Sequence, residues 1–345
     1  MFDLDTFLVT VYCIVDELYR DLVEPQKPRR RGHRAELSDS EVLTLCILAQ
    51  WHPRRSERSF LRYAAAHWHA YFPRLLSQSA FNRRARDLMG ALAYLGPTIS
   101  HETERLLGQS AAYEVLDAVA VPVERCCRGR RHKLFANEAA LSRGGSDHAW
   151  FYGVRLLAAV SPAQQITGFV VGPGNTEERW LADTLFRWRL DPSIPPLTSD
   201  DMDSYLGASH RAGGKRLGPT GPLWPRWGVG TPADCSYLGD LGYRGSHWAT
   251  HWARDYGSHV LTKADFDSLP NPIRRQVKRR FCGRRQIVET VFDWLQDRFG
   301  LLYPRARTAW GLLTRLAAKV AALNLAVHVN YLHGRKPFEF PSVID

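Results

Sequence analysis

The chain has 345 residues, long enough for one large domain and a smaller one, because single hydrophobic cores stop growing near about 250–300 residues. Hydrophobic residues make up 45% and charged residues 23%, which excludes a disordered or collagen-like chain. The formal net charge of +11 is carried mostly by arginine and makes nucleic acid the first partner to consider, although an arginine-rich composition also follows from genome base content.

Cysteine usage and hydropathy indicate the compartment. The six cysteines are scattered and contain no CxxC pair, so the pattern predicts free thiols in a reducing cytoplasm and no disulfide framework. The first 21 residues hold an apolar stretch broken by acids and lack a basic start, which does not predict a signal peptide. We find no stretch of about 18 uncharged apolar residues, so no membrane span is expected.

Residues 1–110 are predicted to be helical. Apolar positions recur there at intervals of three and four residues, and Ser38 with Glu41 forms the sequence signature of a capping box. Three arginine clusters lie between and on these helices: Arg29, Arg30, Arg31 and Arg34; Arg54, Arg55, Arg58 and Arg62; Arg83, Arg84 and Arg86.

A helix opening near Ser79 would present Asn82, Arg83 and Arg86 on neighbouring faces. This arrangement suits a small helical DNA-binding module with one helix in a groove. Each cluster alone is equally well explained as a solvated arginine face. The recurrence of three clusters in one segment favours contact with DNA.

From residue 111 the pattern changes to strand-like runs, at residues 113–123, 150–160 and 166–171. Three strands in close succession predict an antiparallel start to a sheet. A helix is expected from Glu177 to Leu190, followed by a segment that is mostly loop, from Asp191 to about Pro232.

The last third of the chain begins with a basic segment, residues 274–285, that runs into a helix around Glu289. A final helix is expected from Ala309 to Leu332, with its apolar positions forming core. The fold class is therefore α/β, divided into a helical DNA-binding region (1–110), a sheet-containing domain (111–335) and a tail (336–345).

Three acids stand out from their surroundings. Asp117 interrupts an apolar strand-like run, where a buried carboxylate must be compensated by a metal ion, a cation or hydrogen bonds. Asp240 lies between glycines that allow a ligand to approach closely, and Glu289 lies on a mixed helix one turn after Arg285. Each also has an ordinary interpretation: a strand acid paired with an arginine, a turn aspartate, and a surface acid paired with Arg285.

The chemistry gives a reason for the set of three. Two Mg²⁺ ions about 3.5–4 Å apart need several hard oxygen ligands, one ion activating the attacking oxygen and the other stabilising the leaving oxygen. Two aspartates and one glutamate from separate elements would supply such ligands. We therefore take Asp117, Asp240 and Glu289 as candidate catalytic and metal-binding residues.

The residues around these acids resemble bacterial insertion-sequence transposases of the DDE type over about residues 5 to 333. The first aspartate is followed by a small residue, as in Leu116-Asp117-Ala118, and a tyrosine-glycine segment follows at residues 151–155. A small-residue loop leads to an acidic helix start at residues 172–178, and Gly239-Asp240-Leu-Gly-Tyr has the form of the second aspartate motif. Asp234 competes for that role, but no Gly-Tyr follows it at the right distance.

The third motif of many relatives reads tyrosine, two residues, arginine, three residues, glutamate, six residues, lysine. Arg285 and Glu289 match it in register, whereas Cys282 replaces the tyrosine and Gln296 replaces the lysine. The DNA contact that the resemblance assigns to the lysine would pass to Arg298 or another cation.

The resemblance implies a ribonuclease-H-like mixed sheet flanked by helices, with two Mg²⁺ ions as cofactors and Mn²⁺ also accepted. It further implies a cytoplasmic, nucleoid-associated bacterial enzyme that binds the terminal inverted repeats of its own element as double-stranded DNA. Such an enzyme hydrolyses a phosphodiester to expose a 3′-hydroxyl and joins that hydroxyl to target DNA. A homodimer is expected, because two DNA ends are joined together; no membrane partner is expected.

Three other functions stay open. The chain could be a DNA-binding protein that has kept the fold and lost catalysis, or a metal-dependent structure-specific endonuclease without joining activity. A zinc protein built on Cys126, Cys127 and His132 is the weakest of the three, because adjacent cysteines crowd a tetrahedral site.

Overall fold

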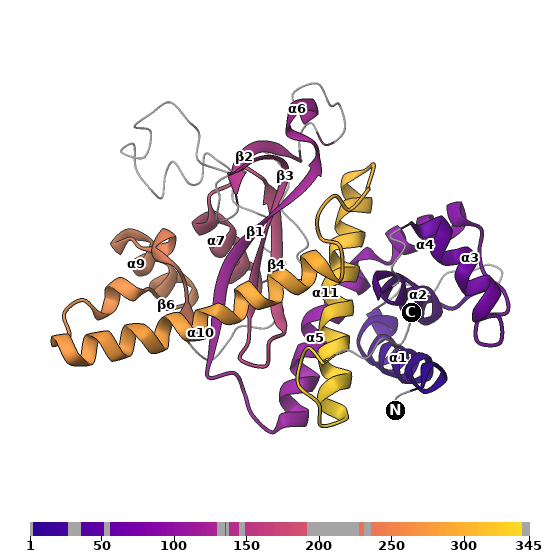
Figure 1. Cartoon of the computed structure of the whole chain (residues 1–345), viewed down its shortest axis with the longest axis horizontal. Coiled ribbons are helices and arrows are strands. Elements are labelled where there is room, and N and C mark those ends of the chain that lie inside the picture. Colours follow the sequence, from indigo (N-terminus) through magenta and orange to yellow (C-terminus); the bar gives the residue numbers. More distant parts are fainter. Residues whose placement is uncertain are drawn as a thin grey trace.

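A mixed β-sheet with helices on both faces forms the centre of the protein, seen in a computed structural model of the chain (Figure 1). The structure describes residues 3–26, 36–51, 56–129, 135, 138–144, 149–191, 228–230 and 236–339. Arg29, Arg30, Arg31, Arg34, Arg54, Arg55, His132, Asp234 and nearly all of the loop expected after Asp191 lie outside the described residues.

The N-terminal third is helical, as predicted. Helix α1 (Leu4–Leu18) continues into a π-helical turn (Tyr19–Val23) and a 3-10 turn (Glu24–Gln26), and the remaining helices are α2 (Asp39–Trp51), α3 (Glu57–His67), α4 (Gln78–Asp87) and α5 (Met89–Leu107). The capping box is confirmed. The backbone N–H of Ser38 donates to Glu41 Oε2 at 2.6 Å, and the backbone N–H of Glu41 donates to Ser38 Oγ at 3.1 Å.

The sheet begins with three long strands in an antiparallel arrangement, as predicted. Strand β1 (Tyr113–Glu124) pairs with β3 (Ala149–Val160), and β3 pairs with β4 (Ile166–Pro173). A short helix α6 (Cys126–Gly129) and strand β2 (Ala140–Gly144) precede β3, and β2 pairs with the part of β3 that β4 leaves free.

Two short strands complete the other side of the sheet. Strand β5 (Ser236–Leu238) lies parallel to β1, and β6 (Val260–Leu261) lies parallel to β5. Since β2 and β4 follow one another along the same edge of β3, the sheet reads β4-β3-β1-β5-β6 with β2 as an extension of that edge.

Gly153 shows why β1 and β3 need a glycine at their contact. A Cβ at this position would lie 2.1 Å from the carbonyl oxygen of Val121 on β1. The carbonyl oxygen of Gly153 also accepts a hydrogen bond from Gly174 N at 3.0 Å. The glycine of the tyrosine-glycine segment is therefore required by close backbone packing.

Alternate residues of the strands enter two separate cores. Helix α7 (Glu178–Leu190) and helix α9 (Ser246–Tyr256) cover one face of the sheet and enclose Leu116, Leu157 and Val170. The opposite face packs Val115, Leu156 and Val171 together with the N-terminal and C-terminal helices. The helix predicted from Glu177 is confirmed to within one residue.

Two long helices end the chain. Helix α10 spans Asn271–Asp297, so the basic segment 274–285 forms the first half of this helix; the expectation that it only leads into a helix was wrong. No proline interrupts α10 between position 272 and its end at Asp297, and long basic side chains are good helix formers, which explains the continuity. Helix α11 (Ala309–Leu332) has the predicted bounds.

Helix α11 is the central core helix of this protein. It is long and apolar enough to be considered as a membrane span by composition, but 94% of its most apolar window is buried inside the protein. It packs along α5, as the ribbons show in Figure 1. Asn324 of α11 donates to the carbonyl oxygens of Gly96 in α5 and Ile166 in β4, at 2.7 and 2.8 Å. The N-terminal helices and the sheet are thus joined through one core.

Candidate functional site

Asp117 lies in the middle of β1 with its side chain 22% exposed. Its Oδ1 accepts from the backbone N–H of Ala118 at 2.8 Å, and its Oδ2 accepts from Arg285 Nη2 at 3.0 Å. Burial raises the pKa of Asp117, the Ala118 N–H and Arg285 oppose this, and the charges of Asp240 and Glu289 add to it. Asp240 and Glu289 are therefore both close enough to Asp117 to affect its charge.

The strand pairing brings Asp240 beside Asp117. Val115 of β1 lies opposite Leu238 of β5, and each aspartate stands two residues further along its own chain. Neighbouring strands lie about 4.8 Å apart. Asp240 ends the strand path and caps a 3-10 turn (Leu241–Tyr243), where its Oδ1 accepts from the backbone N–H of Gly242 at 2.7 Å.

Glu289 lies on α10, the helix that packs against β1. Its side chain is exposed. Arg285, one turn earlier, reaches Asp117 instead, so the arginine links helix and strand. The ordinary interpretation of Asp117, a strand acid paired with an arginine, therefore describes one contact of the site, but not its neighbouring acids.

Glu178 is a fourth carboxylate that the sequence analysis did not assign. It lies in the first turn of α7 and accepts from Arg155 Nη1 of β3 at 2.8 Å. Burial raises the pKa of Glu178 to about 7 against the opposing effect of Arg155, and the charges of Asp117 and Asp240 raise it further. The acidic start of α7 after a small-residue loop, with an arginine in β3, was the sequence signal.

Two buried polar atoms next to these acids lack a partner. The Oη of Tyr243 and the Nε of Arg285 are buried and make no hydrogen bond with the described part of the protein. Burial and the charges of Glu178, Asp117 and Asp240 raise the pKa of Tyr243 well above its usual range. Unsatisfied groups of this kind are expected where water, an ion or a substrate binds.

The donor set suits a hard divalent cation, since carboxylate oxygens are the ligands that Mg²⁺ and Mn²⁺ prefer. Among the described residues, two of the four carboxylates pair with guanidinium groups, Glu178 with Arg155 and Asp117 with Arg285. In the arrangement described, no three such side chains of the described residues stand close enough to hold one ion together. The residues present therefore fit the group by chemistry, and Asp117, Asp240 and Glu289 would have to converge to bind it.

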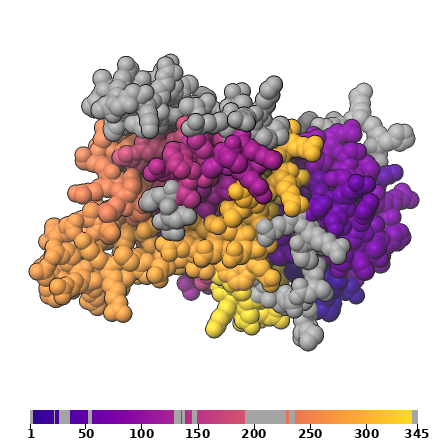
Figure 2. All heavy atoms as spheres, turned by 45° about the horizontal axis from the view of Figure 1, so that its top comes forward, coloured from indigo at the N-terminus to yellow at the C-terminus, as the bar shows by residue number. Residues whose placement is uncertain are grey.

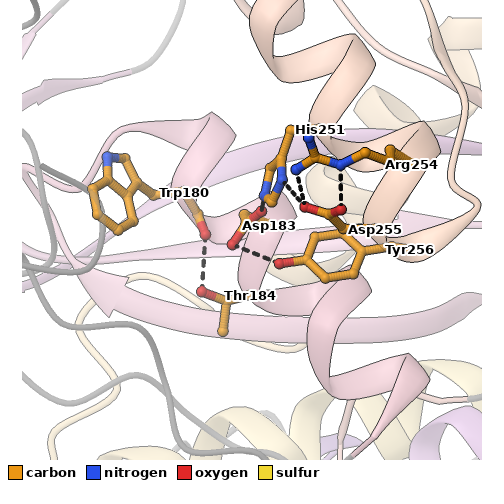
Figure 3. A network of polar contacts seen from close by, with 7 residues as sticks. All are labelled: Trp180, Asp183, Thr184, His251, Arg254, Asp255 and Tyr256. Atoms are coloured by element: carbon orange, nitrogen blue, oxygen red, sulfur yellow. Dashed lines mark hydrogen bonds and ion pairs between the residues drawn. The ribbon is translucent and has the colours of Figure 1, made fainter. Parts of the chain in front are cut away.

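A network of hydrogen bonds and ion pairs connects α9 to α7 (Figure 3). His251 of α9 bonds through Nε2 to Oδ1 of Asp183 at 2.7 Å and through Nδ1 to Oδ2 of Asp255 at 2.6 Å. Arg254 completes the cluster by donating to both oxygens of Asp255, and Tyr256 donates to Asp183. Because α7 carries Glu178, this network helps to hold that carboxylate in place.

The residues predicted to bind DNA in the N-terminal region lie together on α4. Asn82 donates to both carboxylate oxygens of Glu57, at 3.0 and 2.9 Å, and accepts from Arg86. Arg83 is exposed. Asn82 and Arg86 are thus held by internal hydrogen bonds, and Arg83 is the member of the three that projects into solvent.

The remaining predicted positions lie at the C-terminal end of α10 and in α6. Arg298 is exposed at the C-terminal cap of α10, and Gln296, which replaces the family lysine, is partly buried.

The thiol of Cys126 contacts the carbonyl oxygen of Trp150 at 3.0 Å, while Cys127 is exposed. With His132 outside the described residues, the zinc alternative gains no support from the geometry.

Comparison of the chain with protein-family models, with curated proteins and with solved structures gave no match. The functional interpretation therefore depends on the geometry of the site and on the sequence motifs.

Proposed function

We propose that the protein is a DDE-type transposase, which cleaves DNA at the ends of an insertion sequence and joins the freed ends to target DNA with the help of divalent metal ions. One observation carries the proposal: Asp117 on β1 lies near Asp240, which follows the adjacent parallel strand β5, and Glu289 lies on α10, the helix that packs against β1.

The sheet supports the proposal beyond the acids. The order β4-β3-β1-β5-β6, with β3 antiparallel to β1 and with β5 and β6 parallel to it, is the strand order expected of a ribonuclease-H-like domain. The first acid on the central strand and the second after the adjacent parallel strand agree with the resemblance drawn from the sequence.

Two phosphoryl transfers would follow one another at this site. In the first, the oxygen of water forms a bond to phosphorus and the 3′-oxygen leaves as a hydroxyl. In the second, that hydroxyl attacks a phosphodiester of the target, whose own 3′-oxygen leaves. This second step conserves the number of phosphodiester bonds. The bound ions would activate the attacking oxygen and stabilise the leaving oxygen.

The chain's own residues would orient these steps. Asp117 and Asp240 would hold the ions from the sheet and Glu289 from α10. Arg285, now 3.0 Å from Asp117, would neutralise negative charge on the phosphate once the ions take over its partner. Terminal inverted repeats and target DNA are the proposed duplex partners, and a homodimer would hold two ends together.

The test is cleavage and strand transfer on a labelled duplex that carries the inverted repeats flanking the gene, with Mg²⁺ or Mn²⁺. The substitutions Asp117→Asn, Asp240→Asn and Glu289→Gln should each abolish both products while duplex binding persists. Asp267→Asn is the matched control, because this exposed acid pairs with Lys278 and lies outside the cluster. Cleavage without joined products would point to an endonuclease.

Binding without any cleavage by the intact protein would contradict the enzymatic proposal and favour a DNA-binding protein that has lost catalysis. Full activity of Asp240→Asn, combined with loss of activity in Asp234→Asn, would contradict the assignment of the second acid.

A further inference from the structure

The first half of α10 has few contacts with the rest of the protein. Of the five buried residues in this 27-residue helix, Phe281 alone lies before Val288, and its ring packs edge-on against Phe266 of a 3-10 turn (Lys263–Phe266) with centroids 5.6 Å apart. Figure 1 shows this half running out past the edge of the sheet. Packing in the core therefore explains little of the sequence of this half of α10.

The positive charges on this half differ in whether they have partners, and Arg280 is exposed on another face of the helix. Arg274, Lys278 and Arg284 have partners: Arg274 donates to the carbonyl oxygen of Asp267, Lys278 pairs with the carboxylate of Asp267, and Arg284 lies over the ring of Tyr113 at 5.1 Å. Arg275 and Arg279 are exposed and make no hydrogen bond or ion pair with the described part of the chain. Their charges are left to solvent or to a partner.

These two arginines share a helix face with the candidate catalytic glutamate. The positions 275, 279, 282, 286 and 289 follow one another at intervals of four, three, four and three residues, which is the spacing of one helix face. Its members are Arg275, Arg279, Cys282, Gln286 and Glu289, and the first four form what we call the α10 stripe. All five side chains are exposed.

The stripe has the length of a short run of nucleotides. At 1.5 Å per residue, Arg279 and Arg275 lie about 15 and 21 Å along the helix from Glu289. Duplex DNA rises about 3.4 Å per base pair. We infer that the α10 stripe binds the phosphate backbone of duplex DNA about four to six base pairs from the phosphate at the acidic cluster.

This inference rests on the proposed function for its partner and goes beyond it by assigning a binding surface. Charge complementarity favours DNA, because two guanidinium groups on one face, without partners among the described residues, match phosphates, which arginine binds bidentately. The face becomes acidic only at Glu289, where the metal ions are proposed. Figure 2 shows the orange atoms of α10 as an open flank of the molecule.

The first test is the salt dependence of binding to a 30-base-pair duplex of mixed sequence. Each lost phosphate contact lowers the slope of log K against log salt by about 0.9, so Arg275→Gln/Arg279→Gln should lose about 1.8. Arg105→Gln is the matched control, since it removes an exposed charge on α5 that pairs with Glu102, and its slope should equal that of the intact protein.

The outcomes separate the two proposals. An unchanged slope in the double variant, with normal duplex binding by the intact protein, would overturn the stripe and leave the proposed function standing. Failure of the intact protein to bind any duplex, including one with the inverted repeats, would overturn both. Circular dichroism of each variant shows whether the fold is retained, as expected for exposed side chains.

The second test uses the exposed thiol within the stripe. A saturating concentration of duplex should slow the alkylation of Cys282 by a maleimide at least several-fold. The rate is measured by mass spectrometry of the labelled peptide. Cys13 of α1, also exposed, serves as the internal control for loss of reagent. Alkylation of Cys282 at the same rate with and without bound duplex would overturn the inference.

Discussion

Replacing Arg189 by methionine should destabilise the protein strongly, because its guanidinium is the cation for a buried acid. Arg189 of α7 and Glu114 of β1 have side chains only 1% and 4% exposed, and their closest N–O distance is 2.6 Å. Arg189 also donates to the carbonyl oxygen of Val229 at 2.6 Å and to the hydroxyl of Tyr237 in β5 at 2.9 Å. One side chain thus ties α7 to both parallel strands of the site.

The magnitude follows from what the substitution leaves behind. Removal of one partner of a buried ion pair costs about 3–5 kcal/mol, because the remaining charge is buried without compensation. The carbonyl oxygen of Val229 also loses a donor, although such losses overlap with the first. We expect Arg189→Met to lower the free energy of unfolding by about 4 kcal/mol, a large part of the stability of a typical domain.

Urea denaturation followed by tryptophan fluorescence measures this change, and a second variant isolates its cause. Glu114→Gln/Arg189→Met removes the uncompensated charge, so it should be clearly more stable than Arg189→Met alone. A loss of less than about 1 kcal/mol in the single variant would refute the reasoning, since that is the range of exposed pairs. Equal losses in both variants would assign the effect to packing.

Two further predictions concern two buried polar residues, His251 and Asn324. Burial lowers the pKa of His251, but Asp183 and Asp255 raise it above its usual value, so the protonated ring stabilises the fold below pH about 6.5 and this contribution is lost as the pH rises through the folded pKa. The difference in unfolding free energy between the intact protein and His251→Gln should therefore shrink from pH 6 to pH 9, and a constant difference would contradict the assignment. Asn324→Ala should lower the free energy of unfolding by about 2–4 kcal/mol, because it removes three hydrogen bonds to buried backbone groups of Gly96 and Ile166. Asn330→Ala, which removes one bond to Pro337, is the comparison and should cost about 1 kcal/mol by the same urea assay.

Elements with strong local signals could be predicted from the sequence. The bounds of α11 follow from apolar residues at helical spacing, and the capping box before α2 follows from two residues three apart. Strands β5 and β6 were not predicted, since runs of three and two residues carry no periodicity. The pairing of β5 with β1 depends on contacts between segments more than 100 residues apart, and β6 in turn pairs with β5.

The candidate site, too, could be predicted from the sequence only in part. Asp117 could be singled out because a carboxylate in an apolar strand needs compensation, but its nearest cation could not be derived. The ordinary interpretation of Glu289 paired it with Arg285 one turn away, whereas the guanidinium of Arg285 donates to Asp117 on β1. Glu178 was overlooked because its position beside the aspartates depends on how α7 packs on β1 and β3.

The balance of charge in this cluster bears on the proposed metal ions. When all four are ionised, Asp117, Glu178, Asp240 and Glu289 carry four negative charges, whereas Arg155 and Arg285 pair with two of them. Burial and mutual repulsion raise the pKa values of Asp117 and Glu178, so the fold spends stability to keep these acids together. A hydrophobic or singly paired arrangement would avoid that loss. The excess negative charge is consistent with the proposed function, in which a divalent ion bound near Asp117 and Asp240 would supply positive charge.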